Sequence, residues 1–216
     1  MTSPAALPAG SSIDWYFDFI SPFAYLQWQR LRRETPSLTI HPHPVLFAGL
    51  LKHWDNKGPV EIPPKRGWTY AHCLWVAYRH QIPMRLPPQH PFNPLPLLRL
   101  SIALGNSQEV VDRLFRFVWQ DGHLPDETEA WSQLLSELGV TRAVLTSDQA
   151  KAQLLANGES AIAAGVFGVL TAVVKGQCFW GVDATDMLIA FLRGDTFFSS
   201  AEWQDAHSLP EGIQRR

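Results

Sequence analysis

The chain has 216 residues, and its 18 basic and 20 acidic side chains leave a net charge of −2. Binding to a phosphate backbone needs clustered Lys and Arg, whereas here they stand singly or in pairs such as Arg32-Arg33, which argues against a nucleic-acid-binding protein. With 46% hydrophobic and 18% charged residues, the composition is typical of one packed domain, with or without a large insertion.

The cysteines and the start of the chain restrict the class of protein further. Cys73 and Cys178 stand far apart in the sequence, which excludes a disulfide scaffold, a C-x-x-C redox pair and a cysteine-built zinc site. The first twelve residues have neither the basic nor the apolar segment of a secretory signal, and no apolar run approaches the about 20 residues that cross a bilayer. We therefore expect a soluble cytoplasmic protein.

The first part of the chain predicts a strand, a helix and a second strand. Residues 13–19 form a short apolar run rich in β-forming residues. Ser21-Pro22 is typical of a helix N-cap followed by proline at the first helical position, and predicts a helix over residues 22–34. Residues 38–43 alternate as a strand does, and Pro42 and Pro44 favour a sheet edge. Glycines and prolines in residues 47–64 indicate a loop.

The middle of the chain is predicted to be helical. Apolar residues at helical spacing indicate helices over residues 65–79, 95–104, 110–119, 128–138, 147–156 and 159–164. Strand character returns in residues 170–175 and 178–180, which we interpret as a hairpin with a Gly176-Gln177 turn. Asp183 is then expected to cap a helix over residues 184–192, with Asp186 three positions on as in a capping box.

This order of elements predicts an α/β fold, namely a thioredoxin-like domain interrupted by helices. We assign residues 13–62 and 166–194 to the thioredoxin-like domain and residues 63–165 to an all-helical insertion. Residues 195–216 form a polar C-terminal tail. The histidines form no metal-binding helix motif, and His41-Pro-His43 favours a strand edge over a ligand pair, so we expect no metal.

Five segments, in order, carry a resemblance to a known family. They are F-D-F-I-S-P-F-A-Y at residues 17–25, the N-K-G-P and I-P-P-K-R-G stretches within 56–67, P-F-N-P-L at 91–95, G-V-F-G-V at 165–169 and F-W-G-V-D at 179–183. Together they resemble the 2-hydroxychromene-2-carboxylate isomerases and the kappa-class glutathione transferases, which belong to the DsbA-like branch of thioredoxin folds. That branch usually carries C-x-x-C after its first strand. Here residues 21–24 read S-P-F-A, so disulfide exchange is excluded.

The resemblance implies a glutathione-dependent cis–trans isomerase. Its substrate would be an aromatic compound with an unsaturated pyruvate side chain, isomerised by reversible addition of the glutathione thiolate, and the protein would be a homodimer. One alternative is a kappa-like transferase that conjugates glutathione to electrophiles. A second alternative is a non-catalytic ligand-binding protein on the same scaffold.

By this resemblance Ser21 is the catalytic residue and the partner of the glutathione thiolate. A hydroxyl donor at a helix N-terminus stabilises a thiolate, which is the nucleophilic form of a thiol. From the residues alone, Ser21 is equally an ordinary N-cap. Asp183 would meet the α-amino group of the γ-glutamyl end, although a plain helix cap fits the same residue. The backbone of Val169 would pair with the cysteinyl part.

The remaining predicted contacts also have structural alternatives. Asn56 and Lys57 would hold the cysteinyl or glycyl part of glutathione, or form an exposed polar turn. Lys65 would reach a carboxylate, or be solvated surface. Phe23, Trp68 and Tyr70 would line the substrate pocket or be helix core, and the same two interpretations hold for three further aromatic residues, Phe47, Trp54 and Trp75.

The sequence departs from the family at the glutathione site. Leu170 stands where the family has a cis-proline, and because a cis bond before a non-proline residue costs about 2.5 to 4 kcal/mol, we expect a trans Val169–Leu170 bond. Val182 and Ala184 replace a polar residue and an arginine. Both changes weaken the same part of the site.

Overall fold

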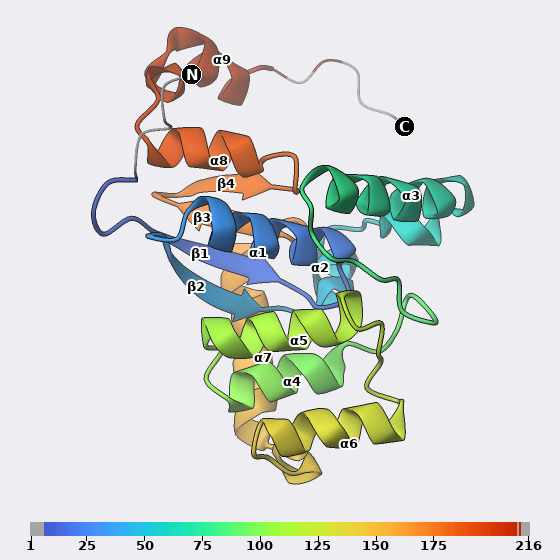
Figure 1. Ribbon diagram of the computed structural model, residues 1–216. Helices are drawn as coiled ribbons and strands as arrows, with labels where there is room; N and C mark the ends of the chain where they lie inside the picture. Colours follow the sequence, from blue (N-terminus) through green and yellow to red (C-terminus); the bar gives the residue numbers. More distant parts are fainter. Residues whose placement is uncertain (1–6, 211, 213–216) are drawn as a thin grey trace.

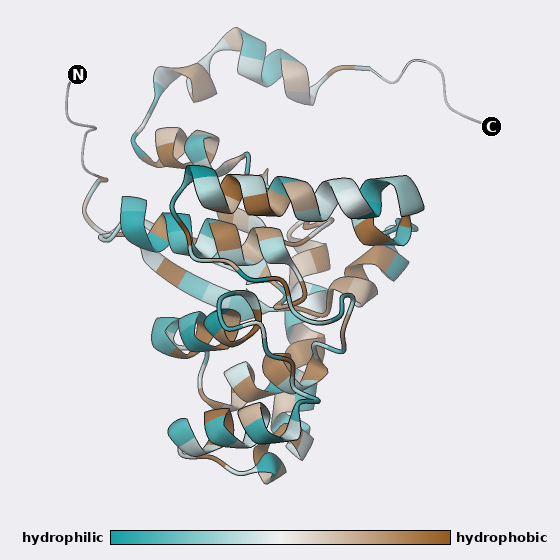
Figure 2. Ribbon diagram, turned by 45° about the vertical axis from the view of Figure 1, so that its right-hand side comes forward, coloured by the Kyte–Doolittle hydropathy of each residue, from teal (hydrophilic) through white to brown (hydrophobic). Residues whose placement is uncertain are grey.

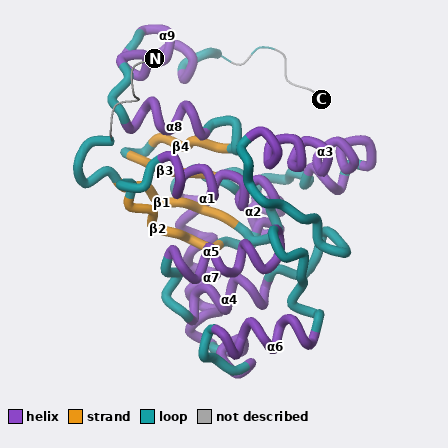
Figure 3. Tube along the Cα trace, in the orientation of Figure 1, coloured by secondary structure: helices purple, strands orange, loops and turns teal. Residues whose placement is uncertain are grey.

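The computed structural model describes residues 7–210 and residue 212. Its sheet has four strands in the order β2-β1-β3-β4. β1 (Ser12–Phe17) pairs in parallel with β2 (Thr39–Pro44) and antiparallel with β3 (Thr171–Val174), which pairs antiparallel with β4 (Gln177–Trp180) (Figures 1 and 3). The expected order of strand, helix and strand at the start, and of a hairpin and helix at the end, is confirmed.

The two faces of the sheet are covered by different helices. On one face, Trp15 and Phe17 of β1 lie against aromatic residues of α1 (Pro22–Glu34) and α5 (Gln108–Trp119). Side chains alternate along a strand, so Tyr16 points to the other face. There its hydroxyl lies 3.4 Å from Ser160 of α7 (Asp148–Ala163). The sheet is thus packed between α1 and α5 on one side and α7 on the other (Figure 1).

The strand β2 lies at the sheet edge, as its prolines predict. His43 of β2 pairs with Asp14 across the strands, with 2.8 Å between Nε2 and Oδ1, and its ring stacks on Tyr16. The histidine at position 43 is therefore part of the strand-edge packing.

The remaining helices lie around the sheet and the three helices that cover it. They are α2 (Phe47–His53), α3 (Pro63–Arg79), α4 (Leu95–Ala103), α6 (Thr128–Glu137), α8 (Thr185–Leu192) and α9 (Ala201–His207), with short 3₁₀ turns at Pro59–Glu61, Arg142–Thr146 and Thr196–Ser199. Helices of the molecule carry both hydrophobic and hydrophilic residues along their length, as amphipathic packing requires (Figure 2). None of the helices in the described ranges combines the length and apolar character needed to cross a membrane.

Two sequence predictions about helices are wrong. The segment 47–64 is not all loop, because α2 buries Leu50 against Tyr16 and Val45 and because α3 already begins at Pro63. The two helices expected over residues 147–164 are one continuous α7. Two buried residues flank Gly158, namely Leu154 before it and Ala161 after it. They hold the helix to its neighbours, so the glycine does not break it.

The hairpin is confirmed, but its turn lies one residue earlier than predicted. Lys175 and Gly176 occupy the turn, with φ of 50° and 78°. Positive φ at both central residues is the geometry of a type I′ turn, whose twist matches that of the flanking strands. Gln177 accordingly belongs to β4, where it pairs with Val174.

Candidate active site

The loop from β1 to α1, residues 18–21, is held by a buried carboxylate. Asp18 is fully buried, and its Oδ1 accepts a hydrogen bond from the N–H of Ile20 at 3.1 Å. Its Oδ2 accepts from the N–H of Phe47, the first residue of α2, at 2.9 Å. Burial raises the pKa of Asp18 to about 7, against the opposing effect of these N–H donors. The loop is thus tied to α2 by a group that titrates near neutrality.

The two carbonyl groups before Ser21 also have side-chain donors. The indole N–H of Trp119, at the end of α5, donates to the carbonyl of Phe19 at 2.8 Å. His90 Nε2 lies 2.8 Å from the carbonyl oxygen of Ile20. A carbonyl only accepts, so Nε2 carries the hydrogen in this contact. The loop is therefore fixed by residues from distant parts of the chain.

His90 is in turn held by Tyr70 of α3. The Tyr70 hydroxyl lies 2.9 Å from Nδ1 of His90. Burial lowers the pKa of His90, which favours the neutral ring, and a neutral ring with its hydrogen on Nε2 accepts at Nδ1. Arg66, also of α3, donates to the His90 carbonyl. This chain of contacts joins the first turns of α3 to the residue before Ser21.

Ser21 is the N-cap of α1, as the sequence predicts. The residue is 9% exposed, and its Oγ accepts a hydrogen bond from the N–H of Ala24 at 3.2 Å. A hydroxyl can accept and donate at the same time. Among residues 7–210 its own O–H donates to no other protein group, so it is available to a ligand at the positive end of the helix.

Val169 lies at the same end of the sheet. Because β1 and β3 are antiparallel with Tyr16 opposite Thr171, the residues before Thr171 run alongside the end of β1 and the Ser21 loop. The Val169–Leu170 bond is cis, so the predicted trans bond is wrong. Leu170 is fully buried and its carbonyl accepts from the N–H of Gly181 at 3.1 Å, so packing of this segment overrides the preference of an isolated peptide.

Asp183 is not the helix cap that the sequence predicts. α8 begins at Thr185 after Ala184, whose side chain makes no capping bond, and Asp183 is exposed to solvent. The predicted capping box fails as well, because Asp186 forms an ion pair with Arg30 of α1. Asp183 stands in the turn two residues after Gly181, whose N–H donates to the Leu170 carbonyl.

The two replacements beside Asp183 are both apolar and buried. Val182 is 7% exposed and Ala184 is 9% exposed, and both belong to the main hydrophobic core. The Thr185 hydroxyl donates to the Val182 carbonyl at 2.6 Å and so holds the turn to the start of α8 without capping the helix. The turn around Asp183 is therefore held by core packing and by backbone contacts.

Asn56 and Lys57 form an exposed polar turn after α2. Asn56 Oδ1 accepts from the N–H of Lys57 at 2.8 Å, and both residues are exposed. The turn follows Trp54, whose indole N–H donates to the Val166 carbonyl at 3.0 Å. This bond brings the turn to the segment that precedes Val169. Lys65 lies exposed in the first turn of α3.

The aromatic residues predicted for the substrate pocket lie in two settings. Phe23, in the first turn of α1, packs edge-on against His72 with 5.6 Å between the ring centroids. His72 in turn stacks on Trp68, with 5.8 Å between centroids. Trp68 is 69% exposed and Trp75 is 58% exposed, so the core interpretation is wrong for both. Tyr70 is half-buried through its contact with His90. An aromatic surface thus begins beside Ser21 and runs along α3.

Comparison with known proteins places this geometry in a family. The sequence model of the DsbA-like thioredoxin domain matches residues 12–193. The chain belongs to the DsbA-like thioredoxin family. It is 30% identical to the 2-hydroxychromene-2-carboxylate isomerase of Pseudomonas sp. (strain C18) over 186 residues, which is 82% of this chain and 87% of that protein. Glutathione S-transferase kappa 2 of Caenorhabditis elegans is 33% identical over 87 residues, 38% of this chain and 37% of that protein.

Solved structures agree with the sequence comparison. A 2-hydroxychromene-2-carboxylate isomerase structure superimposes with a TM-score of 0.72 at 26% identity, covering 89% of this chain and 98% of that one. The cytosolic disulfide reductase DsbM of Pseudomonas aeruginosa, at 14% identity and a TM-score of 0.54, covers 84% of this chain and 99% of that one and shares the fold. The expected family and the DsbA-like α/β fold are confirmed.

Neither cysteine of this DsbA-like protein belongs to the Ser21 loop, since one lies in α3 and the other in β4. Cys73 is buried in α3, and burial raises the pKa of its thiol to about 12. Cys178 is half-buried in β4, its pKa is also raised by burial, and its thiol contacts the Ala164 carbonyl at 3.4 Å. Raised pKa values disfavour the reactive thiolate, as expected for inert structural cysteines.

The sequence patterns do not indicate three residues that hold the Ser21 loop of this DsbA-like protein: Asp18, His90 and Trp119. His90 and Trp119 stand 70 and 100 positions from the carbonyls that they contact. No spacing rule within a helix or strand links residues so far apart. Asp18 offered a local signal, because a carboxylate within an apolar run must find donors when buried.

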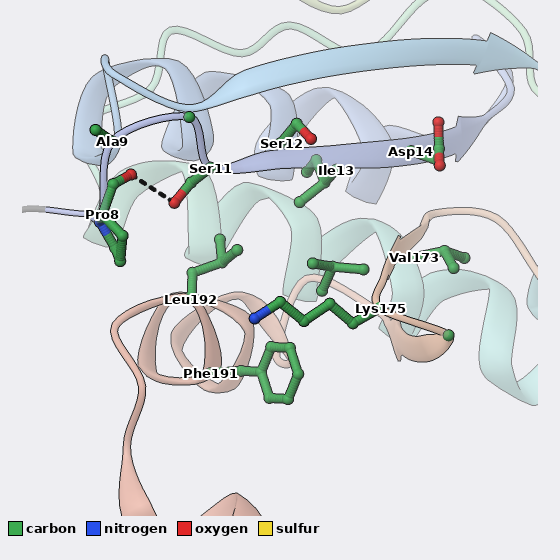
Figure 4. Close-up of a pocket in the computed structure, with 13 residues that line it drawn as sticks. Pro8, Ala9, Ser11, Ser12, Ile13, Asp14, Val173, Lys175, Phe191 and Leu192 are labelled. Carbon is green, nitrogen blue, oxygen red and sulfur yellow. Dashed lines mark hydrogen bonds between the residues drawn. The ribbon is translucent and has the colours of Figure 1, made fainter.

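A hollow of about 420 Å³ lies at the opposite end of the sheet (Figure 4). It is lined by the start of β1, the Lys175 turn and the end of α8, and in Figure 4 the Lys175 side chain extends toward Leu192. Because β1 runs from Ser12 to Phe17, Ser21 follows the other end of this strand. The hollow is therefore separate from the Ser21 site of this DsbA-like protein.

Proposed function

We propose that this protein is a glutathione-dependent cis–trans isomerase that acts on an aromatic compound with an unsaturated pyruvate side chain. Relatives named as isomerases align over 82% and 84% of the chain, whereas the kappa transferase relatives align over 38%. The observation that carries the proposal is the Ser21 hydroxyl, which caps α1 as an acceptor and keeps its O–H available at the helix N-terminus.

The chemistry assigned to Ser21 is stabilisation of a thiolate. A free thiol has a pKa of about 8.5, and a hydroxyl donor and a helix N-terminus each stabilise its anion by about 1 kcal/mol. Together they lower the pKa of a bound glutathione thiol to about 7. The contacts of Trp119 and His90 with the preceding carbonyls fix the position of the hydroxyl, so no reorganisation is needed when the anion forms.

Further contacts with glutathione are proposed for five other residues. The cis Val169–Leu170 segment beside the end of β1 would pair with the cysteinyl backbone. The exposed Asp183 carboxylate would meet the ammonium of the γ-glutamyl end. Asn56 and Lys57, in the turn tied to Val166, and Lys65, in the first turn of α3, would meet the remaining polar and carboxylate groups.

Bound glutathione would supply a thiolate that adds to the conjugated carbon–carbon double bond, allows rotation about the resulting single bond, and leaves again with glutathione unconsumed. The chain's own part is to orient and to exclude water. Phe23 and Trp68, with His72 between them, offer aromatic faces for the substrate ring beside the start of α1. Tyr70 acts indirectly, since its hydroxyl holds His90 and His90 holds the Ile20 carbonyl.

A kappa-like transferase is the second candidate, favoured by the 33% identity to the kappa 2 enzyme over 87 residues. The two functions differ in the fate of glutathione. A transferase consumes one glutathione for each product, whereas an isomerase consumes none. Free thiol is therefore measured while an aromatic unsaturated pyruvate is turned over, and loss of thiol in step with product would support the transferase.

Titration of bound glutathione tests the role of Ser21. Thiolate absorbance is followed against pH in wild type, in Ser21→Ala and in Ser147→Ala. Ser147 is a matched control, because it caps α7 through the N–H of Ala150 just as Ser21 caps α1. We expect Ser21→Ala to raise the thiol pKa by about 0.7, which corresponds to about 1 kcal/mol, and Ser147→Ala to leave it unchanged. An unchanged pKa in Ser21→Ala contradicts the role of Ser21, and absence of binding at millimolar glutathione contradicts both enzyme functions.

A further inference from the structure

A cavity of about 530 Å³ lies between α2 and α7, on the side of the sheet away from α1 and α5. Its volume falls in the range of small-molecule sites. Ser21 is not among its lining residues. The cavity joins two helices from distant parts of the chain with one side chain of α4, and nothing in the proposed isomerase chemistry uses it.

The walls of the cavity are apolar. Leu46 and Leu50 face it from the α2 side, and Leu154, Leu155 and Ile162 from α7. Leu155 and Ile162 stand seven positions apart on one stripe of α7, and Leu154 lies beside that stripe. Leu155 is 66% exposed, so the apolar lining continues to the mouth of the cavity.

Two glycines leave space between these walls. Gly49 on α2 and Gly158 on α7 both line the cavity, and a Cβ atom at either position would meet no other atom within 4 Å. Larger residues at these positions would fill the cavity. The absence of a side chain at Gly49 and Gly158 therefore helps to keep the cavity open.

The polar part of the cavity is mainly cationic. Lys52 comes from α2, Arg99 from α4 and Lys151 from α7, against a single lining carboxylate, Glu159. Lys151 is paired with Asp148 at 2.9 Å. Lys52 and Arg99 thus remain as the positive groups for a ligand, with His53 beside them.

Arg99 has an unmet hydrogen-bonding group. Its Nε is buried and has no hydrogen-bond partner in the described chain. A guanidinium stays charged at all ordinary pH values and its N–H groups can only donate. Because this Nε is closed to solvent, a ligand would reach Arg99 through the terminal N–H groups of its guanidinium, and a carboxylate is the acceptor that fits their geometry best.

We propose that the cavity between α2 and α7 binds a small organic anion with one carboxylate and an apolar body. The carboxylate contacts Arg99 and Lys52, and the apolar body lies against the leucine and isoleucine side chains of α2 and α7. Charge complementarity selects the head group, and the apolar walls select the body. This proposal does not depend on the isomerase function, because it uses none of the residues around Ser21.

Calorimetric titration with octanoate tests the proposal, with octanol and acetate as probes of the apolar and charged parts taken separately. We expect octanoate to bind the wild-type protein, and both other probes to bind at least about tenfold more weakly. Octanol that binds as tightly as octanoate overturns the role of the cations. Absence of octanoate binding at millimolar concentration overturns the site.

Three variants locate the binding. Arg99→Gln removes the unpaired cation and is expected to weaken octanoate at least about tenfold. Leu155→Glu places an acid at the exposed mouth, tests the same site without touching the core, and is expected to weaken octanoate as well. Arg193→Gln, at the end of α8, is the matched control for loss of one positive charge and is expected to leave binding unchanged.

Two results would place octanoate elsewhere. Unchanged affinity in both Arg99→Gln and Leu155→Glu overturns the assignment to this cavity. Displacement of octanoate by saturating glutathione would put it in the Ser21 site instead, and overturns the proposal in the same way. Circular dichroism of each variant confirms that any loss of binding comes from a folded protein.

Discussion

At the scale of single residues, a hydroxyl stands at the helix start where the DsbA-like branch usually carries a thiol. Ser21 stands at the start of α1, where the DsbA-like branch usually places C-x-x-C, and the two cysteines of the chain lie elsewhere. Any sulfur chemistry at this loop must therefore come from a bound thiol. The hydroxyl suits that partner because its accepting side is already used by Ala24.

Asp18 is expected to make the stability of the protein depend on pH. Burial raises its pKa from 3.8 to about 7, so between these pH values the folded chain keeps a proton that the unfolded chain has lost. The free energy of unfolding therefore falls as pH rises through this range, on the order of a few kcal/mol from this residue. We predict that Asp18→Asn removes this dependence. Urea denaturation of wild type and variant from pH 5 to pH 8 measures it.

The effect of Asp18 is the difference between the unfolding free energies of the wild type and Asp18→Asn at each pH. Burial lowers the pKa of His90 from 6.5, so the unfolded chain protonates this residue first and stability from it is lost as pH falls below about 6.5. That contribution has the opposite sign but is common to both proteins, and it cancels in the difference. A difference in unfolding free energy that is the same at pH 5 and pH 8 contradicts the role of Asp18.

At the scale of elements, α7 shows how buried contacts carry a helix through a glycine. Gly158 lies inside the helix, with open space where a Cβ atom would stand. We predict that Gly158→Ala raises the free energy of unfolding by about 0.5 to 1 kcal/mol, because alanine loses less backbone entropy on folding. Thermal or urea denaturation measures the change.

The matched control for this prediction is Gly165→Ala. Gly165 also has open space around it, but its φ is +76° at the end of α7, a conformation that disfavours alanine. We expect this variant to be less stable than the wild type. Equal effects of the two substitutions would show that the helical geometry at residue 158 is not what decides its stability.

At the scale of the whole molecule, α3 leaves a large apolar surface exposed. Trp68, Trp75 and Tyr78 are 69%, 58% and 78% exposed, and Leu74 is 41% exposed. A contiguous apolar patch of this kind on a folded protein usually contacts a ligand or another protein. The part nearest α1, at Trp68, belongs to the proposed substrate surface. The part around Leu74 and Tyr78 therefore remains for contact with another protein.

We predict that the protein is a homodimer and that a second copy covers Leu74 and Tyr78. Size-exclusion chromatography with light scattering should give twice the mass of the chain, and the double variant Leu74→Glu/Tyr78→Glu should give the mass of one chain. Leu155→Glu, which also changes an exposed leucine, should stay dimeric. A monomeric wild type, or a double variant that remains dimeric, contradicts this interface.

The sequence predicted much of the molecule where the signal is local. Ser21 and Pro22 defined the start of α1, and Pro42 and Pro44 placed β2 at the edge of the sheet. These predictions hold because a cap, a missing N–H or an alternating face acts on its own neighbours. The ordered motifs likewise predicted the family. The division into a thioredoxin-like domain and a helical insertion stays a prediction.

Tertiary structure decided what local signals could not. The burial of Leu50 and Leu154 formed α2 and kept α7 whole, and the packing of Leu170 fixed a cis bond that its own peptide preference disfavours. His90 and Trp119 reached the Ser21 loop from other helices. The physical reason is common to all of these. The sequence determines which conformations each segment can adopt at low free energy, whereas the contacts made when distant segments meet select among them.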